Sequence, residues 1–206
     1  MKYSEPFVLA EEPFLETQAK SLAKKLGLLF IGNLQDLRRS LKISRGKESR
    51  QYFLIFSREK IYLRKGLSFN NKPIFCNFLK WSKKLNKTNL TKCMKGVSKD
   101  SLVIDATAGL GQDSLVLALF SKRVILLEKI PWIYTLLKDG LKNTKNLNSI
   151  VNRMHPICTD SKLYLSRNKR KADVIYLDPM FLKKGRSNAK QGIQALRELT
   201  EPEDCA

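Results

Sequence analysis

The stretch that most constrains the fold runs from Ser101 to Glu128 and reads SLVIDATAGLGQDSLVLALFSKRVILLE. A short apolar run, Leu102 to Ile104, leads into the turn Gly109-Leu110-Gly111. An apolar run at helical spacing follows, and then a second apolar run, Val124 to Leu127, which ends at Glu128. Strand, glycine turn, helix, strand and acid in this order predict a nucleotide-type binding crevice in an α/β sheet.

The rest of the C-terminal part continues the alternation. The pattern predicts a helix over Pro131 to Leu147, a third strand over Ile150 to Cys158 and a fourth over Ala172 to Leu177. Strands that alternate with helices favour a doubly wound parallel sheet. Open sheets of this class usually have more than four strands, so the fourth would be an unprotected edge. We therefore expect a Rossmann-like parallel sheet that is incomplete on its C-terminal side.

The N-terminal part has a different pattern. Apolar residues at helical spacing predict a helix within Phe14 to Leu29 that stops at Gly27, and Tyr52 to Leu63 reads as a β-hairpin. The first 13 residues read as a leader or an edge strand. We expect a small α+β unit over residues 1–70 and the Rossmann-like domain over residues 71–206.

The charge of the chain indicates a polyanionic partner. Lys and Arg number 39 against 19 Asp and Glu, which gives a net charge of +20. Nucleic acid is the obvious partner, although the lysine-rich composition of a biased genome is an alternative. Between Ile74 and Lys99 the lysines have no acid among them, so this segment is either a solvated helix face or a phosphate-contacting surface. These lysines are Lys80, Lys83, Lys84, Lys87, Lys92, Lys95 and Lys99.

Other classes of protein are disfavoured. No apolar run approaches the roughly 20 residues of a membrane helix, and the N-terminus does not resemble a signal peptide, so we expect a cytoplasmic protein. The four cysteines lie far apart without a C-x-x-C pair, and His155 is the single histidine. We therefore expect no metal site and no disulfide framework. A monomer is expected.

The residues in and beside the glycine turn disfavour a ligand that contains a pyrophosphate. Ser114 stands where a dinucleotide fingerprint has its third glycine, and Asp105 would repel a pyrophosphate. S-adenosylmethionine fits better, because it carries a sulfonium and an ammonium but no phosphate. Glu128 could accept hydrogen bonds from both ribose hydroxyls. The alternatives are that Asp105 is a turn or capping residue, that Glu128 is a solvated strand end, and that the glycines serve only the turn. An NAD-dependent enzyme is the disfavoured rival.

The fourth strand ends in Asp178-Pro179-Met180-Phe181, on the same edge of the predicted sheet as the glycine turn. The carboxylate of Asp178 and the carbonyl of Pro179 could accept hydrogen bonds from an exocyclic amine, and Phe181 could stack on a base. Orienting the amine would help it attack a sulfonium methyl group, since its lone pair is delocalised into the ring. The alternative is an Asp-Pro turn that ends the strand, with Phe181 in the core.

Three segments together resemble the RsmJ family of bacterial small-subunit rRNA guanine-N2 methyltransferases: DATAGLGQDSLVLA, LLEKIPWIYTLLKDGL and VIYLDPMF. The resemblance implies a class I methyltransferase fold, S-adenosylmethionine as cofactor, and 16S rRNA or the small ribosomal subunit as partner. It implies methyl transfer to N2 of guanosine 1516. By motif match, the implied cofactor-binding residues are Gln112, Asp113, Glu128, Lys129, Asp160, Ser161 and Asp178. With Asp105, Gly109 and Gly111 they complete the predicted cofactor site, while Asp178, Pro179 and Phe181 form the predicted catalytic set.

The chain also departs from the family pattern. Gln112 stands where the family usually has arginine, and Leu182 follows the DPMF motif where it usually has proline. Leu85 to Leu90 replaces a glycine-rich basic stretch, and the family continues into a fifth strand and a final hairpin. These departures motivate an alternative hypothesis, a truncated and catalytically inactive remnant that at most binds RNA.

Overall fold

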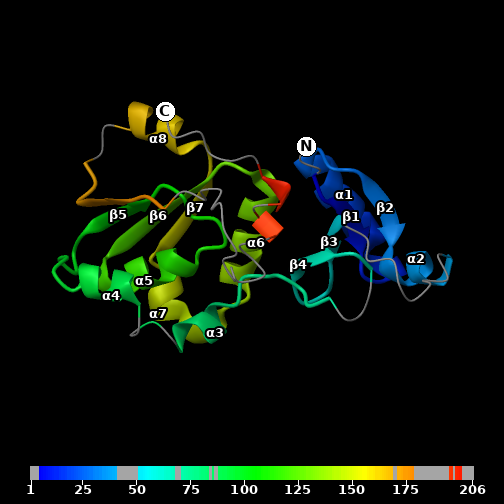
Figure 1. Ribbon diagram of the computed structural model, residues 1–206, viewed down its shortest axis with the longest axis horizontal. Coiled ribbons are helices and arrows are strands. Elements are labelled where there is room, and N and C mark those ends of the chain that lie inside the picture. Colours follow the sequence, from blue (N-terminus) through cyan, green and yellow to red (C-terminus); the bar gives the residue numbers. More distant parts are fainter. Residues whose placement is uncertain are drawn as a thin grey trace. The chain divides into compact units, whose positions relative to one another are not determined.

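The computed structural model describes residues 5–40, 51–67, 71–83, 85, 88–168, 171–178, 195–196 and 198–200. Its internal contacts divide the chain into two compact units, which Figure 1 shows. One comprises Met1–Phe75 together with Met180–Ala206, and the other comprises Cys76–Pro179. The expected domain limits, residues 1–70 and 71–206, stay a prediction.

The first unit is built on a four-stranded mixed sheet in the order β2-β1-β3-β4. β1 is parallel to β2 and β3, and β3 and β4 form the predicted antiparallel hairpin. The strands are β1 Phe7–Ala10, β2 Phe30–Asn33, β3 Tyr52–Phe56 and β4 Ile61–Lys65. The helices are η1 Pro13–Leu15, α1 Glu16–Leu26 and α2 Leu34–Ser40. This is the expected small α+β unit.

One expectation for this unit was wrong, because β1 is an interior strand. Val8, Leu9 and Ala10 are fully buried, since a strand covered on both faces needs apolar side chains in succession. The predicted helix end is confirmed. Gly27 caps α1 with φ 69°, a left-handed conformation that glycine adopts without a steric penalty.

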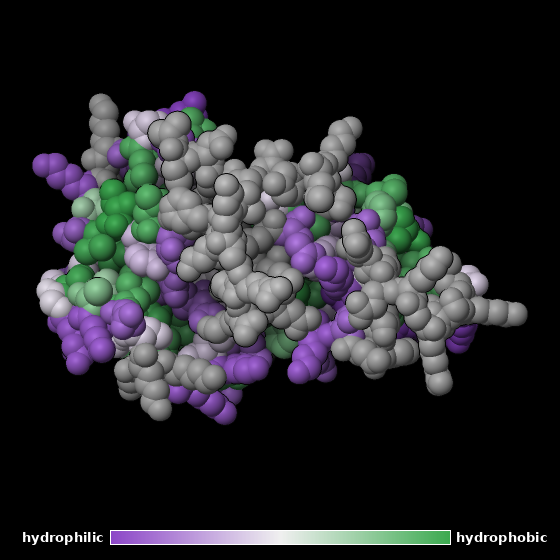
Figure 2. All heavy atoms as spheres, in the orientation of Figure 1, coloured by the Kyte–Doolittle hydropathy of each residue, from purple (hydrophilic) through white to green (hydrophobic). Residues whose placement is uncertain are grey.

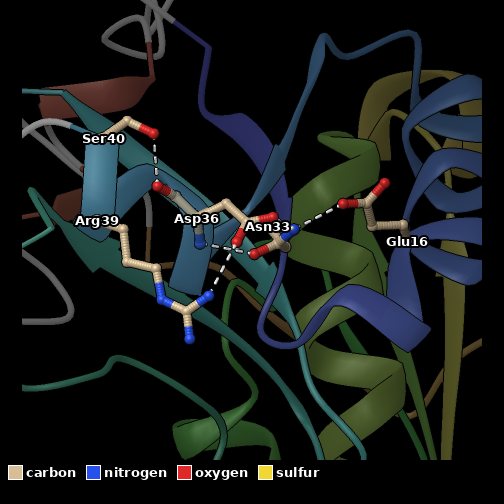
Figure 3. A network of polar contacts seen from close by, with 5 residues as sticks. All are labelled: Glu16, Asn33, Asp36, Arg39 and Ser40. Carbon is tan, nitrogen blue, oxygen red and sulfur yellow. Dashed lines mark hydrogen bonds and ion pairs between the residues drawn. The ribbon is translucent and has the colours of Figure 1, made fainter.

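Sequence patterning missed β2 and α2, which meet at Asn33. The side chain of Asn33 is buried, and Figure 3 shows it between Glu16 and Asp36. Its Nδ2 donates to Glu16 Oε1 at 2.7 Å and to Asp36 Oδ2 at 2.8 Å. Its Oδ1 accepts from the backbone N–H of Asp36 at 2.8 Å, so Asn33 caps the first turn of α2. One amide thus joins α1, β2 and α2.

The second unit is built on a parallel sheet in the order β7-β6-β5-β8. Figure 1 shows α8 on one face of this sheet and α4, α5 and α7 on the other. The strands are β5 Leu102–Asp105, β6 Arg123–Glu128, β7 Met154–Cys158 and β8 Val174–Tyr176. The helices are α3 Phe78–Ser82, α4 Asn89–Met94, α5 Gln112–Phe120, α6 Pro131–Lys142, η3 Lys145–Leu147, α7 Asn148–Val151 and α8 Ser161–Arg167. The predicted parallel Rossmann-like sheet is confirmed.

The strands of this sheet differ in burial. In the central strands, Val103, Val124 and Leu126 are fully buried. β8 lies at an edge, and no other strand among the described residues pairs with its free side. Ile175 is 55% exposed and Leu177 is 63% exposed, and Figure 2 shows a hydrophobic area over this part of the unit. The edge position of the fourth strand is as predicted. Within the described part of the chain, no helix is long and apolar enough to cross a membrane.

Candidate active site

The glycine turn connects the carboxyl end of β5 to the first turn of α5. Gly109 has φ 52° and Gly111 has φ 78°, so both adopt the left-handed conformation that favours glycine. A Cβ atom at Gly111 would lie 2.6 Å from Leu137 Cδ1 and 3.3 Å from Phe78 Cζ, whereas one at Gly109 would have no heavy atom within 4 Å. Gly111 is therefore required for close packing, and the space beside Gly109 is open to a ligand.

Replacing Gly111 by alanine is expected to destabilise the second unit by about 2–4 kcal/mol, because a strained backbone and an overpacked methyl group both add to the cost. Urea unfolding followed by the fluorescence of Trp81 and Trp132, which both lie in this unit, measures the change. Gly96→Ala is the matched control, since a Cβ atom there meets nothing within 4 Å and Gly96 has no positive φ. Equal unfolding midpoints for the two variants would contradict the prediction.

Asp105 ends β5 and is only 1% exposed. Its Oδ2 accepts from Ser114 Oγ at 2.5 Å, and its Oδ1 accepts from the backbone N–H of Thr107 at 3.1 Å. Burial raises the pKa of the Asp105 carboxyl to about 6, against the opposing effect of these two hydrogen bonds. The buried carboxyl thus stabilises the turn and the start of α5 through these two hydrogen bonds. Its direct contact with a cationic cofactor stays a prediction.

The raised pKa of Asp105 makes stability depend on pH. Its folded value of about 6 exceeds the unfolded value of 3.8, so the stabilisation by the neutral carboxyl is fully present below about pH 4 and is lost as the pH rises through 6. Asp105→Asn cannot ionise. Its free energy of unfolding relative to the wild type is expected to rise by roughly 2.4 kcal/mol between pH 4 and pH 7. Urea unfolding across this range measures the difference, and exposed Asp100→Asn should show no such trend. A constant difference for Asp105→Asn would refute the burial argument.

Glu128 ends β6 and is 8% exposed. Its Oε2 accepts from the backbone N–H of Gly109 at 3.0 Å, and its Oε1 accepts from that of Ile130 at 2.8 Å. A carboxylate accepts hydrogen bonds from N–H and O–H groups alike, so an acid at this position is chemically suited to ligand hydroxyls as well as to the turn. The neighbouring Lys129 is exposed. This geometry suits a ribose at the end of β6.

The other predicted cofactor residues lie in the first turns of two helices. Gln112 and Asp113 open α5 and are half-buried. Asp160, which follows β7, caps α8, because its Oδ1 accepts from the backbone N–H of Leu163 at 3.0 Å. Ser161 is the first residue of α8. The helix α8 was not predicted, although an aspartate before an apolar run is a normal helix start.

Two contacts bring the end of β8 to the glycine turn. The backbone N–H of Asp178 donates to Thr107 Oγ1 at 2.8 Å, and Tyr176 Oη donates to Asp113 Oδ2 at 2.9 Å. Burial and the Asp113 carboxylate raise the pKa of the Tyr176 hydroxyl, so it remains a donor. Neither Thr107 nor Tyr176 was predicted from the sequence. Pro179 and Phe181, the other predicted catalytic residues, lie outside the described residues.

Carboxylates gather where all four parallel strands end, and we call this set the acidic rim. Its members are Asp105, Asp113, Glu128, Asp160 and Asp178. Such a set favours a ligand with positive charge and hydroxyl groups and disfavours one with phosphates. Among the described residues, no group of three or more His, Cys, Asp or Glu side chains could hold a metal ion. The carboxylates of the acidic rim fit S-adenosylmethionine, which carries positive charge and hydroxyl groups.

A parallel sheet with a glycine turn after one central strand and an acid after the next is the architecture of a class I, Rossmann-like methyltransferase. The chain belongs to the family described as "Putative SAM-dependent methyltransferase", whose model matches residues 36–204. The predicted cofactor, S-adenosylmethionine, is confirmed by this membership.

Individual relatives agree with this assignment. Ribosomal RNA small subunit methyltransferase J of Francisella tularensis subsp. novicida is 35% identical over 144 residues, covering 65% of this chain and 60% of the relative. The protein of the same name from Francisella philomiragia is 35% identical over 150 residues, covering 67% and 62%. The match thus spans about 60% of the length of these relatives, and the resemblance to the RsmJ family is confirmed.

A solved structure shows the same fold. The crystal structure of a SAM-dependent methyltransferase from Neisseria gonorrhoeae superposes with a TM-score of 0.59 at 20% sequence identity. The superposition covers 84% of this chain and 69% of the other. The class I methyltransferase fold predicted from the sequence is therefore confirmed.

Proposed function

We propose that this chain transfers a methyl group from S-adenosylmethionine to the N2 amino group of a guanosine in 16S rRNA, at position 1516. The observation that carries the proposal is the hydrogen bond from the Asp178 N–H to Thr107 Oγ1, at 2.8 Å. It fixes the exposed Asp178 beside the glycine turn, where a cofactor and an amine could meet. Relatives that are named small-subunit rRNA methyltransferases supply the class of substrate.

In this proposal some residues at the acidic rim hold the cofactor and Asp178 acts on the substrate. Glu128 accepts hydrogen bonds from the cofactor ribose while it holds Gly109 and Ile130. Gln112, Asp113, Lys129, Asp160 and Ser161 surround the rest of the cofactor, and Asp105 holds the turn in shape. When bound, S-adenosylmethionine supplies an electrophilic methyl group.

Asp178 acts on the substrate. Its carboxylate accepts a hydrogen bond from the guanine amine, which fixes the nitrogen lone pair in one direction and can take up the released proton. The Pro179 carbonyl is proposed as a second acceptor and Phe181 as the ring that stacks on the base. The guanosine must be unpaired or flipped out of a helix to reach this edge of the sheet.

The experiment that tests the proposal is transfer of a tritiated methyl group to 16S rRNA or to small ribosomal subunits from a strain lacking this activity. Digestion to nucleosides should place the label in N2-methylguanosine, and mapping should place it at guanosine 1516. No incorporation by folded protein would refute the activity, and label in another nucleoside would refute the target. A cytoplasmic location and a monomeric state are part of the same proposal.

One observation favours a second candidate, RNA binding without catalysis. The end of β8 that carries Asp178 also exposes Ile175 and Leu177, so little apolar packing holds it in place. Calorimetry with S-adenosylmethionine separates the two candidates. Saturable heat at micromolar cofactor supports the enzyme, whereas a folded chain that gives none supports a protein that only binds RNA.

A further inference from the structure

Helix α3 adjoins the glycine turn of the acidic rim, and α4 packs against α5, which begins at that turn. Phe78, the first residue of α3, is fully buried, and its ring lies where it would contact a Cβ atom at Gly111. The Phe78 ring also packs edge to face against Trp81, with 5.2 Å between their centroids. Both helices pack against α5, which begins at the turn. The packing of α3 and α4 against α5 therefore fixes where the charged side chains of these two helices lie relative to the site.

The charged residues exposed on these two helices and at their C-caps are all basic. We call this set the lysine face, and it consists of Lys80, Lys83, Lys92 and Lys95. All four side chains are exposed, and no acid occurs between Ile74 and Lys99. Figure 2 shows hydrophilic side chains gathered over α4. Lys20, Lys65 and Lys122 form ion pairs with acids, but no lysine of this face has an acidic partner within the described part of the chain.

The charges of the second unit are thus separated. The acidic rim repels phosphates, so an RNA strand that inserts a base there must place its backbone elsewhere. The lysine face lies on two helices that pack against α5, which begins at the same turn, and lysines bind phosphates without reading sequence. We propose that the lysine face holds the RNA phosphates that flank the target nucleotide, so that only the base enters the acidic rim. This inference rests on the proposed function, because it takes RNA to be the substrate.

The double variant K80E/K92E tests the inference in the full chain. Binding to in vitro transcribed 16S rRNA is expected to weaken by about 10–100-fold near 0.1 M salt. The slope of log K against log salt should decrease by about 1.5, since two phosphate contacts are lost. The matched control is R167E/K171E, which makes the same change in charge at exposed positions at the end of α8 and before β8. The control should bind within about 3-fold of the wild type.

The outcomes are distinct. Unchanged RNA binding by K80E/K92E, or equal losses of affinity in both variants, overturns the inference. The inference is that the position of the lysines, and not the total charge of the chain, determines RNA binding. K83E/K95E repeats the test on the other two lysines if the first variant unfolds, and calorimetry with S-adenosylmethionine shows whether each variant is folded. A wild-type chain that binds RNA through the lysine face but transfers no methyl group would refute the proposed function and leave this inference standing.

Discussion

Replacing Asp178 by asparagine is expected to slow methyl transfer by about 10³-fold, the effect of removing one well-placed catalytic acceptor. The amide nitrogen of asparagine would present N–H groups to an amine that itself needs acceptors. The contact that places residue 178 should survive, because it runs from the backbone N–H to Thr107 Oγ1. The fold and the position of the side chain are therefore retained while its chemistry is lost.

Single-turnover transfer at saturating cofactor measures this effect, because it isolates the chemical step from cofactor binding. Asp100→Asn is the control, since Asp100 is exposed and its ion pair with Lys122, at 3.8 Å, is a weak surface contact. Its rate should stay within a factor of two of the wild type. A rate for Asp178→Asn within 10-fold of the wild type would remove Asp178 from the catalytic set.

Glu128→Gln is expected to weaken S-adenosylmethionine binding by about 100-fold, which corresponds to about 2.7 kcal/mol. Glutamine keeps one acceptor oxygen, but its NH₂ group must face either the Gly109 N–H or the Ile130 N–H, both of which now donate to carboxylate oxygens. Its loss of charge also weakens the hydrogen bonds to the ribose hydroxyls.

Isothermal titration calorimetry of the full chain measures this affinity. Glu12→Gln makes the same chemical change in the first unit, which does not contain the acidic rim, and should bind the cofactor like the wild type. If Glu128→Gln bound the cofactor normally, Glu128 would be only a structural acceptor for the turn.

The second sheet could be predicted because its signals are local. The run from Leu102 to Glu128 contains two apolar strands, and the glycines between them permit the positive φ angles that the turn requires. β2 and α2 could not be read in the same way, since a four-residue strand shows too little alternation. The signal that could have found them is Asn33 followed by Asp36, a capping pattern at the start of a helix.

The site was predicted less completely because its geometry depends on contacts between distant residues. Thr107 and Asp178 are 71 positions apart, and only the pairing of β5 with β8 brings them together. The buried Asp105 likewise accepts a hydrogen bond from Ser114, nine positions away, which in the sequence stands out only as a replacement for a glycine. A motif identifies which residues lie at a strand end, but not whether a carboxylate points to a ligand or into the protein.

The exposed side of β8 links protein concentration to activity. No strand of the described residues pairs with the free side of β8, and such an edge with apolar side chains is a template for another chain. Asp178 follows this strand by two residues. A second molecule that paired with β8 would also cover the approach to Asp178. Self-association and methyl transfer should therefore exclude each other. Because the monomer is the proposed active state, specific activity is expected to rise on dilution at any concentration where light scattering detects complexes that dissociate.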